Sequence, residues 1–290
     1  MFKRILPTLL SFDIEWVPDP MAAEALFGVR HDPPYSLPDA YRRLWQLAGA
    51  TDEQPRPFVK TMLCRVVTIA GIFRECAADL DAPGGERITL KLVSLPLDPA
   101  DSEKCRERTI LNSFLKSVGA RRPQLVGYNS VNSDVPILLQ RAVANGLQGH
   151  GFGARPEKPW EGSDYFSTAS DYHVDLAHAL GGGRNTPRLD EAARVCGIPG
   201  KVDVAGDQVW EMYSLGRIGD ILAYNEFDAF TTHLLWARVA HFGCMLTTEA
   251  YLREQDLVRE LAEHHASNGK PHLERWLAEW DRLIAINGRF

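Results

Sequence analysis

Two carboxylates spaced two residues apart inside an apolar run constrain this chain more than any other feature. Residues 8–16 read TLLSFDIEW, with Asp13 and Glu15 near the end. The run predicts a strand, along which side chains alternate between the two faces. Asp13 and Glu15 therefore share one face, while Phe12 and Ile14 point into the opposite layer. Neighbouring carboxylates must lose charge, reach water or share a cation. Hard oxygen ligands of this kind suit Mg²⁺ or Mn²⁺.

Two further carboxylates stand at recognisable places. A strand-like run, 124–128, breaks at 129–133, and Asp134 then opens a helix at the position of an N-cap, since Pro136 is tolerated in a first turn. Asp228 lies in a long predicted helix, 217–242, four residues after Tyr224, so the two side chains share a face. Taken singly, these residues have ordinary explanations: an exposed edge pair, a helix cap, a half-buried tyrosine and a solvated acid. Together and in this order they predict one shared metal site.

These residues also carry a family resemblance. Residues 12–15, residues 126–129 with 134–138, and the Tyr224-x-x-x-Asp228 spacing resemble the three motifs of the DEDD 3′–5′ exonucleases. The tyrosine spacing resembles the subclass that includes the proofreading domain of family-B DNA polymerases. In particular, the chain resembles stand-alone bacterial predicted exonucleases related to that domain. The resemblance covers about residues 6–243, including 173–176 and 189–201. It departs at Ser133, where the family usually has an aromatic residue that helps wall the site.

The resemblance implies a two-metal phosphodiester hydrolase. Its ligands would be Asp13, Glu15, Asp134 and Asp228, holding two divalent cations, Mg²⁺ or Mn²⁺, about 3.5–4 Å apart. Tyr224 would orient the attacking water. A phenol with a pKa near 10 is a weak base at pH 7, so activation of the water falls to the metal. Nucleoside 5′-monophosphates would leave from a 3′ end.

Several other residues are candidates for substrate contact. Asn129 follows the second motif and either hydrogen-bonds the terminal nucleotide or serves as a turn residue. Trp16 and Tyr128 adjoin motif residues and either stack on a base or belong to the core. Asp175 is expected to be structural, holding a loop or a helix start. Three basic residues flank Gly-rich segments and either meet phosphate or are simply solvated: Arg184, Arg188 and Lys201.

The expected order of elements is that of an α/β, ribonuclease-H-like fold, with a mixed five-stranded sheet flanked by helices and extra C-terminal helices. The strands are expected at 8–15, 62–73, 87–95, 124–128 and 173–176, and the helices at 101–118, 135–145, 188–196, 206–214 and 217–242.

Residues 1–243 are expected to form the exonuclease domain. A Pro-rich insertion, 17–59, would border the site and contain one helix, with a capping box from Ser36 to Asp39. Residues 244–290 would form a helical extension. In it, apolar residues at helical spacing favour packing on the domain's own core over binding a partner: Leu273, Trp276, Leu277, Trp280, Leu283 and Ile284.

The amino-acid composition restricts the classes of protein to which this chain can belong. The 290 residues are 45% hydrophobic and 24% charged, which is ordinary for a globular protein. No apolar run reaches the roughly 20 residues that span a bilayer, and the run before Pro7 is too short for a signal peptide. The five cysteines include no Cys-x-x-Cys pair. This pattern predicts reduced thiols in the cytoplasm and no zinc site.

The net charge of −6 argues against tight binding of a duplex but not against an enzyme that takes a strand end. The expected partner is therefore a nucleic acid 3′ end, single-stranded DNA before RNA, with a polymerase or repair protein as a possible further partner. Two alternatives stay open. One is a 3′–5′ exoribonuclease or oligoribonuclease, and the other is a non-catalytic relative that binds nucleic acid or a polymerase. The sequence predicts no membrane role, and it does not determine the oligomeric state.

Overall fold

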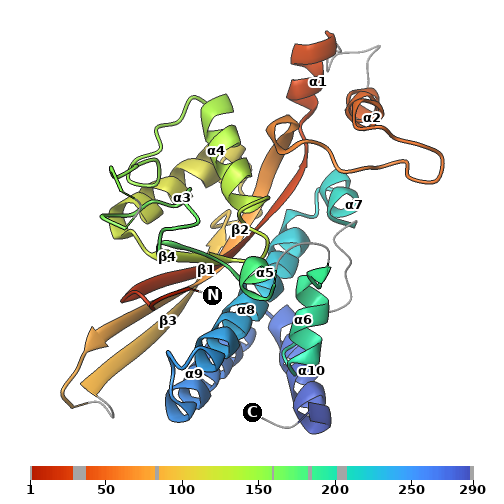
Figure 1. Cartoon of the computed structure of the whole chain (residues 1–290). Coiled ribbons are helices and arrows are strands. Elements are labelled where there is room, and N and C mark those ends of the chain that lie inside the picture. Colours follow the sequence, from red (N-terminus) through yellow and green to blue (C-terminus); the bar gives the residue numbers. More distant parts are fainter. Residues whose placement is uncertain are drawn as a thin grey trace.

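The computed structural model describes residues 2–28, 37–81, 85–158, 160–181, 185–200 and 208–287. Its centre is a five-stranded sheet in the order β3-β2-β1-β4-β5 (Figure 1). β1 pairs antiparallel with β2 and parallel with β4, β2 pairs antiparallel with β3, and β4 pairs parallel with β5. This is the mixed five-stranded sheet that the sequence predicts, with the acidic strand at its centre. The strands are β1 (Thr8–Pro18), β2 (Cys64–Ala78), β3 (Glu86–Leu95), β4 (Gln124–Gly127) and β5 (His173–Asp175).

Helices cover both faces of the sheet (Figure 1). α3 (Glu107–Arg121) and α4 (Asp134–Ala144) lie on one face, where their apolar residues form a core with Leu10, Phe12 and Ile14 of β1. α8 (Ile218–Phe242) covers the other face, where Leu9 of β1 belongs to its core. The two-residue alternation of β1 is therefore confirmed. Asp13 and Glu15, in step with Leu9, belong to the face that α8 covers.

The remaining helices surround this sandwich. α1 (Pro20–Phe27) and α2 (Leu37–Leu47) form the insertion that follows β1, and they stand next to α7 (Val209–Ser214) in Figure 1. Three short helices lie between the longer elements: η1 (Thr61–Leu63, a 3-10 turn), α5 (Leu176–Ala179) and α6 (Leu189–Val195). α9 (Thr248–Ser267) and α10 (His272–Asn287) complete the chain. No helix in the described ranges is both long and apolar enough to cross a membrane.

The structure corrects two predicted elements. The insertion holds two helices, not one, because Asp19 caps α1 by accepting the Met21 N–H (3.2 Å) and Pro20 fits a first helical turn. The expected start of the second helix at Ser36 lies outside the described residues. α3 begins at Glu107 instead of 101, because the Asp101 carboxylate accepts the backbone N–H groups of residues 103 and 104 and holds a turn there.

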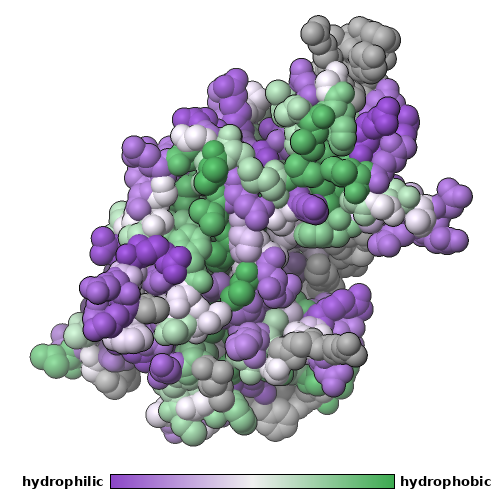
Figure 2. Space-filling view, turned by 45° about the horizontal axis from the view of Figure 1, so that its top comes forward, coloured by the Kyte–Doolittle hydropathy of each residue, from purple (hydrophilic) through white to green (hydrophobic). Residues whose placement is uncertain are grey.

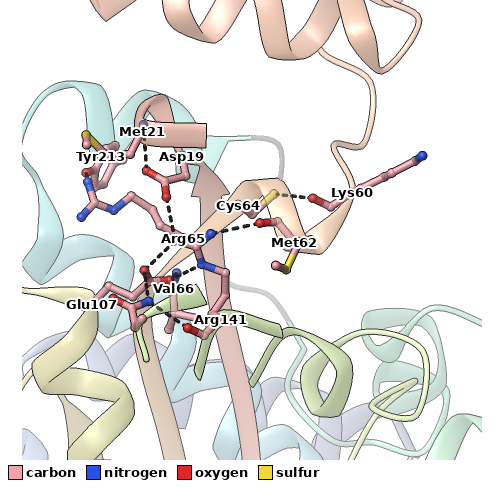
Figure 3. A network of polar contacts seen from close by, with 11 residues as sticks. Asp19, Met21, Lys60, Met62, Cys64, Arg65, Val66, Glu107, Arg141 and Tyr213 are labelled. Carbon is pink, nitrogen blue, oxygen red and sulfur yellow. Dashed lines mark hydrogen bonds and ion pairs between the residues drawn. The ribbon is translucent and has the colours of Figure 1, made fainter. Parts of the chain in front are cut away.

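A buried ionic network anchors the start of the insertion to the α3/α4 layer (Figure 3). The Arg141 guanidinium lies between Asp19 (Nη2 to Oδ2, 2.6 Å) and Glu107 (Nη2 to Oε2, 2.8 Å). It also donates to the Met62 carbonyl oxygen at 3.0 Å. The second Glu107 oxygen accepts the backbone N–H of Val66 on β2 at 2.8 Å. One arginine therefore joins α4 to the end of β1, to the start of α3 and to the segment before β2.

The C-terminal helices are attached to the sheet through α8. Trp276 and Trp280 of α10 are buried, and the Trp276 ring lies 5.2 Å from that of Phe230 on α8. A buried polar chain reaches further inward. The His233 ring lies 2.9 Å from the Ser11 hydroxyl of β1 and 3.1 Å from Glu254 of α9. The outer helices thereby hold α8 against β1. Where one domain ends and an extension begins remains a prediction.

Candidate active site

Three carboxylates from two elements converge at one place. Each of Asp13, Glu15 and Asp228 offers an oxygen atom, and these atoms all lie within 4.8 Å of one another. The convergence follows from local rules. β1 presents two acids on the face toward α8, and α8 carries the third acid where it crosses β1. The three side chains line a cavity of about 1250 Å³.

The pairing of β1 with β2 shifts by one residue immediately after the acids. Glu15 pairs with Thr68, but Trp16 pairs with Val66, so β2 contributes one extra residue. A bulge of this kind bends the strand and increases its twist, and such bulges are common beside active sites. The bulge lies on β2, opposite the step from Glu15 to Trp16, and Trp16 also lines the cavity.

Asn225 fixes the orientation of Asp13. Its amide nitrogen donates to Asp13 Oδ2 at 2.6 Å, and its amide oxygen accepts the Thr68 hydroxyl at 3.3 Å. Asn225 is fully buried. The sequence analysis missed it, although it lies three residues before Asp228 and so on the same side of the helix. The signal available in the sequence was the amide side chain of Asn225 between the motif residues Tyr224 and Asp228.

Asp134 lines the same cavity but does not belong to the group of three. The predicted N-cap role is wrong. Ser133 is the N-cap and Asp134 the first helical residue, so its carboxylate is not used in capping. One oxygen, Oδ2, accepts the Ser133 hydroxyl at 2.7 Å. The other, Oδ1, is buried without a hydrogen-bond partner among the residues that the structure describes. Burial raises the pKa of Asp134 to about 7, although the Ser133 hydroxyl lowers it in part.

The loop that carries Asp134 is held by Asp175. Its carboxylate accepts the backbone N–H groups of Asn129 (2.9 Å) and Val131 (3.0 Å), and it also caps α5 by accepting that of Ala177 (3.0 Å). The structural role expected of Asp175 is thus confirmed. β4 ends at Gly127, where a side chain would place its Cβ only 2.5 Å from Ser130 Cβ.

The three candidate substrate-binding residues, Trp16, Tyr128 and Asn129, all line the cavity. The Tyr128 hydroxyl donates to the Pro187 carbonyl oxygen, which fixes the ring. The Asn129 amide oxygen accepts from the Asn132 side chain at 2.9 Å. Both side chains are therefore oriented before any substrate binds.

The structure separates the remaining candidates. Arg188 lines the cavity, but its side chain is 83% exposed and pairs with Glu191 at 3.0 Å. Arg184 and Lys201 lie outside the described residues. Tyr224 is 1% exposed within an apolar cluster and is not on the cavity wall. That cluster comprises Val17, Val67, Val209, Met212, Ile221 and Tyr224.

Residues 56–280 match a family described as predicted 3′–5′ exonucleases related to the exonuclease domain of PolB. The chain belongs to this family. The enzyme class expected from the sequence, a 3′–5′ exonuclease, is thereby confirmed at the level of the family. A search of curated proteins found no match.

Solved structures similar to the chain include the family B DNA polymerase from the hyperthermophilic archaeon Pyrobaculum calidifontis. The TM-score is 0.45 at 17% sequence identity, over 91% of this chain and 29% of the polymerase. The chain thus spans less than a third of that polymerase's length.

The donor set of this exonuclease site fits divalent cations. Carboxylate oxygens are the ligands that Mg²⁺ and Mn²⁺ prefer. Three of them meet within 4.8 Å, and the Asp134 carboxylate is buried on the wall of the same cavity. Like charges brought this close repel one another unless a cation or a proton compensates them.

Proposed function

We propose that this exonuclease hydrolyses single-stranded nucleic acid, DNA before RNA, from its 3′ end, in a reaction that depends on two divalent cations. The observation that carries the proposal is the convergence of Asp13, Glu15 and Asp228 within 4.8 Å on the wall of a large cavity. Family membership supports the direction of cleavage.

The four carboxylates would share the cations between them. Asp13, Glu15 and Asp228 would hold the cations, and Asp134 would support them directly or through water. Bound in this way, Mg²⁺ or Mn²⁺ supplies a water of lowered pKa and neutralises charge on the leaving 3′ oxygen. Asn225 keeps Asp13 turned toward the cavity through its 2.6 Å hydrogen bond.

The cavity walls would orient the terminal nucleotide. Trp16 and Tyr128 offer ring faces for the base, and Asn129 offers a hydrogen-bonding amide. The role of Tyr224 in orienting the attacking water stays a prediction.

The preference for DNA rests on the family's relation to a polymerase exonuclease domain. An exoribonuclease or oligoribonuclease would use the same carboxylates and differ in accepting the 2′-hydroxyl. A non-catalytic relative is disfavoured because all four carboxylates are present. A polymerase or repair partner and a cytoplasmic location stay predictions.

The test is digestion of 5′-labelled single-stranded DNA, single-stranded RNA and mismatched duplex with Mg²⁺ or Mn²⁺. A descending ladder is expected, and the rates rank the substrates.

Asp13→Ala and Asp228→Ala should abolish trimming while the protein stays folded. Asp281→Ala is the matched control, since Asp281 is 65% exposed and pairs with Arg259. Trimming by Asp13→Ala at the wild-type rate would refute the proposal. Cleavage of circular single strands would indicate an endonuclease instead. Absence of Mn²⁺ binding at the cluster would favour the non-catalytic alternative.

A further inference from the structure

A second hollow, here named the aromatic groove, opens between α1, α2 and α7. It measures about 1020 Å³. Its wall carries four aromatic side chains, Tyr41, Trp45, Trp210 and Tyr213. The ring of Trp210 lies 4.0 Å from that of Tyr41 and 5.2 Å, edge-on, from that of Trp45. In Figure 2, apolar side chains gather below the grey atoms at the top of the view, over α1 and α2. These aromatic rings therefore pack against one another and form one wall of the groove, beside an apolar surface.

The charge of the aromatic groove is opposite to that of the chain. Arg42, Arg56 and Arg65 line it, and within the described ranges no carboxylate does, although the whole chain carries a net charge of −6. Arg42 and Arg56 pair with Asp39 (2.6 Å) and Glu211 (3.2 Å) in exposed contacts. Exposed pairs of this kind contribute little, so a phosphate can compete for the same guanidinium groups.

The third of the hollows, here named the linking groove, shares wall residues with both the aromatic groove and the active-site cavity. It measures about 640 Å³. Trp16 and Gln208 line both the linking groove and the active-site cavity. Trp45 and Trp210 line both the linking groove and the aromatic groove. The three hollows are therefore neighbours that share wall residues, in a series from the acidic cluster to the arginines. The insertion borders the site in this indirect way, since none of its described residues, 17–28 and 37–59, lies on the cavity wall.

The linking groove has a mixed wall. Phe58 is 68% exposed on it, and Glu53 and Glu211 also line it. A ring held in water offers a stacking face, whereas the two carboxylates disfavour phosphate close to them. A chain that passes here should contact the wall through bases, and its phosphates should lie toward Arg56 and the aromatic groove.

We propose that the linking groove and the aromatic groove bind the single strand on the 5′ side of the nucleotide being removed. The proposal rests on the proposed function, which places the 3′ end at the acids. Aromatic faces that take bases and arginines that take phosphates are the combination that holds single strands without reading their sequence. A duplex hides its base faces and cannot use the rings. The ligand class is therefore single-stranded nucleic acid that extends several nucleotides beyond the scissile end.

The first experiment measures binding against length. Fluorescence anisotropy in EDTA, which withholds the metal, gives the Kd of 5′-labelled oligothymidylates of about 4, 8, 12 and 16 nucleotides, the usual range for such sites. The affinity of the wild-type chain should rise with length and then level off. Phe58→Ala should weaken binding of the longer strands roughly tenfold and affect the shortest strand least. Phe242→Ala is the matched control, since Phe242 is 77% exposed and lines none of the three hollows.

A second variant tests the charge of the groove independently. Arg42→Gln combined with Arg56→Gln removes two phosphate contacts. The slope of log K against log salt should therefore become shallower by about 1.4 for the longest strand. Arg87→Gln is the matched control, because Arg87 is 65% exposed and pairs with Asp79 at the far end of β3. All of these side chains are exposed, and thermal melting by circular dichroism verifies that each variant is folded.

The two proposals fail in different ways. If the wild-type chain trims a 3′ end but its Kd does not change with length, the groove proposal is wrong and the proposed function stands. Equal losses in the groove variants and the control variants would also overturn it. Binding of a proline-rich peptide together with length-independent binding of oligonucleotide would assign the groove to a protein partner. If no substrate is trimmed while affinity still rises with length, the groove proposal survives as a binding site and the proposed function falls.

Discussion

Replacing Arg141 with methionine should strongly destabilise the protein. The guanidinium makes two bonds to Glu107 (both 2.8 Å), one to Asp19 (2.6 Å) and one to the Met62 carbonyl oxygen (3.0 Å). The three charged side chains are only 5–8% exposed. Methionine fills similar space but leaves two carboxylates buried without their cation. Removing one partner of a buried pair costs about 3–5 kcal/mol. We therefore expect a loss of about 4 kcal/mol in the free energy of unfolding.

Urea titration followed by circular dichroism measures this loss. Arg282→Met is the matched control. Arg282 is 54% exposed and pairs with Glu279, so its replacement should change stability by no more than about 0.5 kcal/mol. Adding Glu107→Gln to Arg141→Met should recover part of the loss, because the amide is neutral. A loss below about 1 kcal/mol for Arg141→Met, or no recovery in the double variant, would refute the argument from burial.

Two further predictions concern Glu226 and Asn225. Burial alone would raise the pKa of Glu226, but the hydrogen bond from His272 and the charge of Lys270 outweigh it, and the pKa is lowered. The stabilisation from Glu226 is therefore complete above the unfolded value of about 4.5 and is lost as pH falls through the folded value. Urea midpoints between pH 7 and 3 should fall less steeply for Glu226→Gln than for wild type, and parallel curves would contradict this. Asn225→Ala should lower Mn²⁺ affinity or trimming rate about 10–100-fold by releasing Asp13, as measured by calorimetric titration and ladder assays. Unchanged values for both would show that Asp13 needs no support.

The parts of the site that follow from the repeat of a single strand or helix could be predicted from the sequence. The two-residue repeat of β1 places Asp13 and Glu15 on one face, and the position of Asp228 in a long helix allows it to meet them. The contact between Asn225 and Asp13 depends on how α8 is rotated over the sheet, which only the packing of whole layers decides. The first helix of the insertion was missed because the segment was interpreted as Pro-rich, although Asp19 and Pro20 form a regular helix start.

Tyr224 shows the limit of reasoning from helical spacing. Residues four apart differ by about 40° around the axis and by about 6 Å along it. That offset is enough to place Asp228 on the cavity wall while the Tyr224 ring packs in an apolar cluster with residues of α7. Sharing a helix face therefore predicts that the two residues lie near each other, and the role of the Tyr224 hydroxyl stays a prediction.

The hydrogen-bonded chain through Ser11, His233 and Glu254 affects how well the acidic cluster should keep its geometry when denaturant is added. Ser11 lies two residues before Asp13 on the same side of β1, so the central strand is held to α8 at two successive positions, by His233 and by Asn225. Strand and helix are thus coupled as one rigid body at the point where their acids meet. Loosening of the opposite layer, α3 and α4, would alter access to the cavity before it altered the spacing of the carboxylates. Metal affinity should accordingly outlast trimming activity as denaturant is raised.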